Sequence, residues 1–150
     1  MGSCFSKEPV VTVVLEKEVD WSTVHYEDTT PFVLPLRSGK VVKVYDGDTF
    51  TVAFVFNGVL HRTQVRMLGI DTPEIKGVTE VEKTRARAAR TALQELILNK
   101  VVELTNTKME PKWGRLLADV WVGGVHVNDY MLREGYAVPY DGGKKVENWN

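Results

Sequence analysis

The order of the sequence patterns predicts an α+β fold that is mainly β. Five stretches alternate apolar and polar residues as strands do, and two others carry the start and stop signals of helices. Three strands come first, then a helix, then two more strands and a short second helix. Short turns separate the strands within each group, so neighbouring strands are expected to pair as hairpins. This order is typical of a five-stranded OB-type barrel with two main helices.

The first three strands are predicted at residues 40–44, 50–56 and 60–68. In the first of them Val42 and Val44 alternate with Lys43, so we expect both valines to face the core. Asn57-Gly58 separates the second strand from the third. This pair is the strongest two-residue hairpin signal, because a type I′ turn needs positive φ at both central positions. A hairpin is therefore predicted here.

Capping signals place the two helices. Thr79-Glu80-Val81-Glu82 has the form of a capping box and predicts a helix that runs to about Leu98, with Asn99 as its stop. Its apolar stripe is formed by Ala89, Leu93, Leu96 and Ile97. Asn128 is predicted to cap the short helix 129–134. The last two strands fall between the helices, at residues 101–104 and 116–122.

Composition is that of a folded protein of ordinary charge. The 150 residues are 43% hydrophobic and 26% charged, which favours one globular domain. Net charge is −1, but it divides into −3 for residues 1–39 and +2 for residues 40–150. A weakly basic body predicts weak, salt-sensitive binding to polyanions. Four cations of the first helix, Lys83, Arg85, Arg87 and Arg90, form either a phosphate-tracking patch or a solvated face.

The predicted organisation has three parts. Residues 1–8 are a possible acylated segment, residues 9–39 are an N-terminal arm, and residues 40–150 are the folded domain. Met1-Gly2-Ser3-Cys4-Phe5-Ser6 fits the pattern for N-myristoylation of Gly2, and Cys4 is a candidate for a second, palmitoyl anchor. Acylation would place the chain on the cytosolic face of a membrane; otherwise a cytoplasmic location is expected. A chance match or an expression leader beginning Met-Gly-Ser is the alternative explanation.

Two further features of the N-terminal half bear on compartment and packing. No apolar run approaches the roughly 20 residues needed to span a bilayer, and residues 9–15 are interpreted as a strand instead of a signal peptide. Cys4 is the only cysteine, which excludes an internal disulfide and fits a reducing compartment. The arm 9–39 is expected to lie on the body and bury Phe32 and Leu34.

Two acidic turns are candidates for a metal site. Asp48 follows Gly47 in a turn between strands, and Asp71 ends another strand. Curvature of the barrel would bring these turns together. Two carboxylates, a backbone carbonyl and waters are oxygen-only ligands, which suit Ca²⁺ far better than Zn²⁺. The structural alternative is a turn aspartate that bonds its own backbone, and it suits Asp46 well.

An arginine and a glutamate flank the second of these turns. By alternation Arg66 shares a strand face with Leu68 and Ile70, which is unusual for an arginine unless it lines a cleft. The alternative is a surface arginine on an edge strand. Glu74 follows Pro73, which fixes the backbone before it. Cleaving a phosphodiester needs cations near the phosphate oxygens and a carboxylate that prepares water.

Three segments in order resemble the staphylococcal nuclease (thermonuclease) family, and together they span about residues 40–140. They are Asp46-Gly47-Asp48-Thr49, Val65-Arg66-Met67-Leu68-Gly69-Ile70-Asp71-Thr72-Pro73-Glu74 and Lys112-Trp113-Gly114-Arg115. The resemblance implies that Asp48, Asp71 and the main-chain carbonyl of Thr72 hold Ca²⁺. It further implies that Arg66 and Arg115 bind the phosphate, and that Glu74 orients or deprotonates the attacking water.

The resemblance also names substrate-binding positions, which are Lys112, Trp113 and Tyr140. Trp113 either stacks on a base or sugar, or is a half-buried turn residue. The third, C-terminal helix of the family is expected to be shortened or absent, because only residues 141–150 follow Tyr140.

The sequence therefore leads us to expect a monomeric Ca²⁺-dependent nuclease that acts on DNA and RNA. The resemblance implies that it leaves 3′-phosphate ends. One rival hypothesis is a catalytically silent scaffold of the same fold that binds nucleic acid or protein. A second is a membrane-tethered interaction protein whose acylated arm carries the function.

Overall fold

The computed structural model describes residues 18–145 and residue 149. The chain divides into two units between Pro31 and Phe32, and each is considered by itself. The described part of the first unit holds two 3₁₀ turns, Trp21–Thr23 and Tyr26–Asp28, whose residues are exposed. The predicted strand at residues 9–15 and the acylation candidates Gly2 and Cys4 lie outside the described residues.

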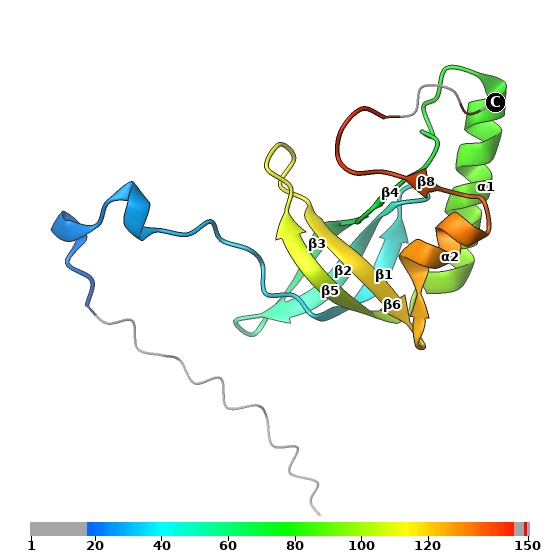
Figure 1. Ribbon diagram of the computed structural model, residues 1–150. Coiled ribbons are helices and arrows are strands. Elements are labelled where there is room, and N and C mark those ends of the chain that lie inside the picture. The colour runs from blue at the N-terminus through cyan, green and yellow to red at the C-terminus, as the bar shows by residue number, and fades with distance from the viewer. Residues whose placement is uncertain (1–17, 146–148, 150) are drawn as a thin grey trace, which may run out of the picture. The chain divides into compact units, whose positions relative to one another are not determined.

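The second unit is a closed β-barrel, which confirms the predicted fold class (Figure 1). Its five long strands are β1 (Ser38–Val44), β2 (Thr49–Phe56), β3 (Val59–Met67), β5 (Val101–Met109) and β6 (Leu116–Val122). They follow the order β3-β2-β1-β5-β6, and parallel pairing of β3 with β6 closes the barrel. Three short strands complete the sheets: β4 (Ile70–Asp71), β7 (Val125–His126) and β8 (Val138–Pro139).

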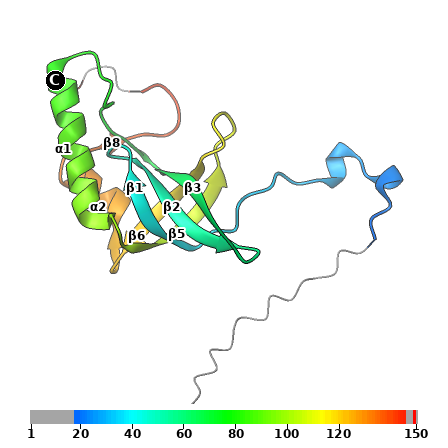
Figure 2. The ribbon, with the colours of Figure 1, turned by 180° about the vertical axis from the view of Figure 1, so that it is seen from behind.

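Two helices pack on the barrel, as the sequence predicts. α1 spans Glu80–Ile97 and α2 spans Val127–Arg133 (Figures 1 and 2). The Thr79 hydroxyl accepts the Glu82 N–H at 3.1 Å, so the predicted N-cap is confirmed. The other half of the capping box differs, because the Glu82 carboxylate accepts from Val78 N–H. Of the described residues after Tyr140, none lies in a helix.

Local conformation at the predicted turns agrees with the residue types. Asn57 and Gly58 have φ of 49° and 74°, as the predicted hairpin turn between β2 and β3 requires. Asn99, the predicted helix stop, has φ of 63°. Asn tolerates this left-handed conformation better than most residues, so α1 ends where the sequence places its end.

The inward face of β1 differs from the prediction. Val41 and Val44 are buried, whereas Val42 is 44% exposed. The register with β2 shifts between Val41 and Lys43, which marks a β-bulge that inserts one residue into the strand. The bulge breaks the strict alternation, so the expectation that Val42 faces the core is wrong and Val41 takes that position.

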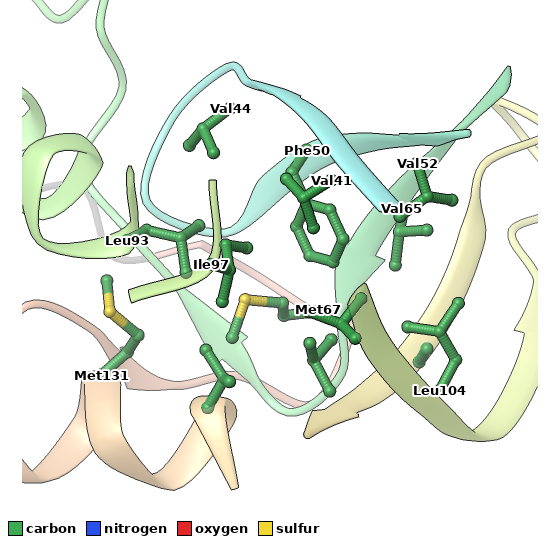
Figure 3. Close-up of a cluster of buried hydrophobic side chains, with 14 of the residues drawn as sticks. Val41, Val44, Phe50, Val52, Val65, Met67, Leu93, Ile97, Leu104 and Met131 are labelled. Carbon is green, nitrogen blue, oxygen red and sulfur yellow. The ribbon is translucent and has the colours of Figure 1, made fainter. Parts of the chain in front are cut away.

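The core fills the barrel and continues to both helices. Phe50, Val52, Val65 and Met67 lie inside the barrel, with Leu104 toward one end (Figure 3). Leu93 and Ile97 of α1, together with Met131 of α2, close the opposite end. Phe32 is largely exposed and Leu34 is only partly buried, so the expected burial of Phe32 is wrong. Among the described residues there is no helix of the length and hydropathy that crossing a bilayer demands.

Asn128 has a different role from the one its position in the sequence indicates. α2 begins at Val127, so Asn128 lies inside the helix and does not cap it. Its buried amide instead accepts the Val120 N–H at 2.9 Å and donates to the Leu68 carbonyl at 2.8 Å. These bonds tie α2 to β6 and to the end of β3. The predicted capping role is wrong because a buried amide satisfies backbone groups of two other elements.

Replacing Asn128 with Ala is expected to lower the free energy of unfolding by about 2–4 kcal/mol, since a buried N–H and a buried carbonyl both lose their partners. Asn128→Asp keeps the acceptor for Val120 but loses the donor, and it places a carboxylate near Asp119, whose oxygen lies 3.4 Å from the present amide nitrogen. We expect that variant to be destabilised as well. Urea denaturation measures the free energy of unfolding of both variants. If Asn128→Ala were as stable as wild type, the structural role of Asn128 would be contradicted.

Candidate active site

The two acidic turns meet at one end of the barrel. The Asp48 carboxylate accepts the backbone N–H of Thr72 at 3.1 Å, which joins turns that lie 24 residues apart in the chain. Its other oxygen accepts the Thr49 hydroxyl at 2.8 Å. Asp46 accepts the backbone N–H of Asp48 at 3.1 Å, so the interpretation of Asp46 as a turn aspartate is confirmed.

Gly47 is the reason the two turns approach so closely. A Cβ added at this position would lie 2.7 Å from the Ala89 side chain of α1 and 2.9 Å from the Thr72 side chain. Only glycine fits between the helix and the second turn without displacing one of them. The sequence Asp46-Gly47-Asp48 thus sets the separation of the two acidic turns as well as their chemistry.

Arg66 lies between the carboxylates of the two turns. Its side chain is only 8% exposed. One terminal nitrogen, Nη2, is 3.1 Å from Asp71 and 3.6 Å from Asp48. The Tyr140 ring lies against the guanidinium group, 5.1 Å from Cζ to the ring centroid. The alternative of a surface arginine on an edge strand is therefore wrong.

Pairing of two short strands brings Tyr140 to this place. β4 pairs antiparallel with β8, with Asp71 opposite Val138. The Tyr140 N–H then bonds the Gly69 carbonyl at 2.9 Å. The segment after α2 is thereby fixed beside the Asp71 turn, which the sequence pattern does not indicate.

Lys145 joins the site, and sequence reasoning missed it. Its ammonium nitrogen is 2.7 Å from a Glu74 oxygen and 3.5 Å from an Asp71 oxygen. Seventy-one residues separate Lys145 from Glu74, and no motif links the two. Only the strand pairing described above places the C-terminal loop near the carboxylates.

Arg115 directly precedes β6, the strand that neighbours β3. Parallel pairing places Arg66 opposite Leu117, so Arg115 lies two residues further back along the neighbouring strand. Glu110 holds the Arg115 guanidinium with two hydrogen bonds, 2.6 Å to Nε and 2.9 Å to Nη2. The remaining nitrogen, Nη1, has two N–H groups that do not bond to Glu110. Glu110 is the second site residue that sequence reasoning missed.

The loop before Arg115 presents an aromatic ring to solvent. Trp113 is 66% exposed, so the half-buried turn interpretation is wrong. The Lys112 ammonium lies over the Trp113 ring, 4.9 Å from its centre, in a cation–π contact. Because the ring is largely exposed, it could stack on a planar group with the face that Lys112 does not cover.

The charged groups at this end of the barrel perturb one another. Burial and the charge of Asp48 raise the pKa of Asp46 to about 7. Burial raises the pKa of Asp71, with a smaller contribution from the charge of Asp48. Burial lowers the pKa of Lys145, but its hydrogen bond to Glu74 and the charges of Asp71 and Glu74 together raise it. The acids repel one another, and the cations offset part of that repulsion.

The donor set fits a hard divalent cation. Asp48 and Asp71 would supply carboxylate oxygens and Thr72 a backbone carbonyl, all ligands that Ca²⁺ prefers. The Thr72 hydroxyl is buried beside these groups and has no hydrogen-bond partner among the residues that the structure describes. Within residues 18–145 and 149, no three Asp, Glu, His or Cys side chains come close enough to form a metal cluster. With Asp48, Asp71 and Thr72 as the protein ligands, water would complete the coordination of the ion.

The fold and the site together define an OB-type barrel protein with a cluster of acids and arginines at one end of the barrel. Residues 64–148 match the family model described as staphylococcal nuclease homologue, which is more than half of the chain. The chain belongs to the staphylococcal nuclease family.

Several relatives with nuclease names align with the chain. A thermonuclease of Staphylococcus hyicus is 36% identical over 100 residues, which are 65% of this chain and 56% of the relative. Endonuclease YncB of Bacillus subtilis is 35% identical over 63% of this chain and 44% of its own length. Endonuclease Htp3 of Saprolegnia parasitica is 31% identical over 68% and 55%. The chain thus spans about half the length of these relatives.

Proposed function

We propose that this protein is a Ca²⁺-dependent nuclease that hydrolyses phosphodiester bonds in DNA and RNA and leaves 3′-phosphate ends. The observation that carries the proposal is the position of Arg66 between Asp48 and Asp71. Glu74 and Arg115 lie at the same end of the barrel. A binding-only barrel has no physical need for carboxylates beside a phosphate site, because they repel the phosphate.

Each group has a task at the reacting phosphate. Arg66 and Arg115 bind the phosphate oxygens, where negative charge grows in the transition state. Glu74 accepts a hydrogen bond from the attacking water and orients or deprotonates it. Lys145 holds the Glu74 carboxylate by an ion pair and also lies close to Asp71. Asp48, Asp71 and the Thr72 carbonyl would hold Ca²⁺, which when bound supplies positive charge at the phosphate oxygens.

Cleavage assays with calcium and with chelator test the proposal. Labelled single-stranded DNA, duplex DNA and RNA are incubated with the protein in either condition, and products are separated by length and end group. We expect cleavage only with Ca²⁺, and products that a 3′-phosphatase can modify. Binding of the same substrates without cleavage in either condition would favour a silent scaffold instead. Sedimentation of the same preparations tests the proposed monomer.

Arg115→Ala is expected to lower kcat by about 10²–10³-fold, because one of the two cations at the developing charge is lost. Arg115 and Glu110 are partly buried but do not belong to the hydrophobic core, so the fold should survive. Glu110→Gln is the companion variant: it keeps Arg115 but weakens the pair that orients it, so its loss of kcat should be smaller. Steady-state kinetics of both variants show which of them loses more kcat. An unchanged kcat in Arg115→Ala would remove that arginine from the mechanism.

Membrane tethering is a separate proposal that rests on the sequence pattern at Gly2 and Cys4 alone. Gly2→Ala should move the protein from the membrane to the soluble fraction of a eukaryotic cell, because one remaining acyl signal anchors poorly. The nuclease activity of the Gly2→Ala protein should equal that of wild type. Equal membrane association of Gly2→Ala and wild type would contradict the proposal.

A further inference from the structure

The outward face of β1, β2 and β3 begins at the candidate active site and leads away from it. Arg66 pairs with Thr49 at the covered end of this face. Because side chains alternate along a strand, every second pair lies on the same face. In order from Arg66, the next pairs on it are Gln64 with Thr51, Arg62 with Ala53, and Leu60 with Val55.

This face carries positive charge without compensating acids. β1 adds Lys43 opposite Thr51 and Lys40 opposite Ala53. Lys40, Lys43 and Arg62 are exposed. In the described part of the chain, none of these three cations pairs with a carboxylate. The three strands themselves contain no Asp or Glu.

The face is also hollowed and partly apolar. Two adjoining grooves of about 600 and 510 Å³ run over it and share Val42 and Arg62 in their walls. Ala53 and Leu60 line the second groove. Tyr45 follows Lys43 at the active-site end; its side chain is half-exposed, and its N–H bonds the Thr49 carbonyl. Cations beside apolar and aromatic side chains suit a single strand, whose phosphates and bases are both accessible.

We propose that this face, the sheet track (Lys40, Lys43, Tyr45, Arg62 and Gln64), binds the single-stranded nucleic acid that extends from the phosphate at Arg66. β1, β2 and β3 face the viewer in Figure 2. Four residues of strand separate Arg66 from Arg62, which is about 13 Å, or the length of a few nucleotides. The inference rests on the proposed nuclease function and adds an extended substrate-binding surface to it.

Binding assays in chelator test the sheet track without cleavage. Fluorescent oligothymidylates of two and about twelve nucleotides are titrated against wild type and the double variant Lys43→Gln/Arg62→Gln. The matched control is Arg85→Gln/Arg87→Gln, which removes the same charge from the exposed face of α1. Thermal unfolding of all three proteins verifies that the exposed substitutions leave the fold unchanged.

The sheet variant should bind the longer oligonucleotide about tenfold more weakly at low salt, with a salt slope shallower by about 1.4, since two phosphate contacts are lost. Its affinity for the short oligonucleotide, and the affinities of the helix control, should stay within about twofold of wild type. Equal binding by the sheet variant and wild type, or a larger loss in the helix control, would overturn the inference. Length-dependent binding that needs Lys43 and Arg62, without any calcium-dependent cleavage, would uphold the sheet track and refute the nuclease proposal.

Discussion

Glu74→Gln is expected to lower kcat by about 10²–10⁴-fold, because an amide neither accepts a proton from water nor attracts it as a carboxylate does. KM should change little, since Glu74 contacts the water and not the phosphate in the proposed mechanism. The side chain is 53% exposed, so the amide should fit without disturbing the barrel. Single-turnover cleavage with saturating Ca²⁺ measures the chemical step directly.

Two variants control for the loss of an ion pair. Glu80→Gln removes a carboxylate that also pairs with a lysine, Lys83 at 3.3 Å, but on the surface of α1. It should cleave at the wild-type rate. Lys145→Met keeps the Glu74 carboxylate and removes its partner, so it reports how much of the Glu74→Gln effect comes from the ion pair alone. A Glu74→Gln protein within a few-fold of wild type would exclude Glu74 from preparing the water.

Arg66→Ala should lower both activity and stability, unlike Glu74→Gln. Without calcium, Asp48 and Asp71 would remain buried with their main partner removed. Losing one side of a buried ion pair costs about 3–5 kcal/mol, so the free energy of unfolding should fall by about that amount. Loss of a phosphate contact made in both the ground and transition states should raise KM and lower kcat.

Calcium titration distinguishes this explanation from simple loss of packing. If Ca²⁺ binds the carboxylates that Arg66 leaves unpaired, adding it should restore part of the lost stability, because ligand binding to the folded state alone stabilises it. Arg66→Lys keeps the charge but not the fork-like geometry, so it should be more stable than Arg66→Ala and still cleave slowly. Denaturation curves with and without Ca²⁺ provide the measurement. Wild-type stability and cleavage in Arg66→Ala would contradict the assignment.

Residues with strong local preferences allowed the fold to be predicted from the sequence. Asn57-Gly58, Thr79 and Asn99 each favour one backbone conformation through steric or hydrogen-bonding effects within a few residues. Where local preference competes with packing, prediction failed. The bulge after Val41 and the buried amide of Asn128 both satisfy distant partners, and nothing within a few residues of either indicates them.

The sequence by itself determined which chemical groups the site has: the acids of the two turns, Arg66, Glu74 and Arg115 all stand in recognisable local motifs. The tertiary structure alone decided their mutual arrangement. Closure of β3 on β6 and pairing of β4 with β8 bring Glu110, Tyr140 and Lys145 to these groups. The physical reason is that strand pairing joins residues far apart in the chain, and its register depends on the whole barrel.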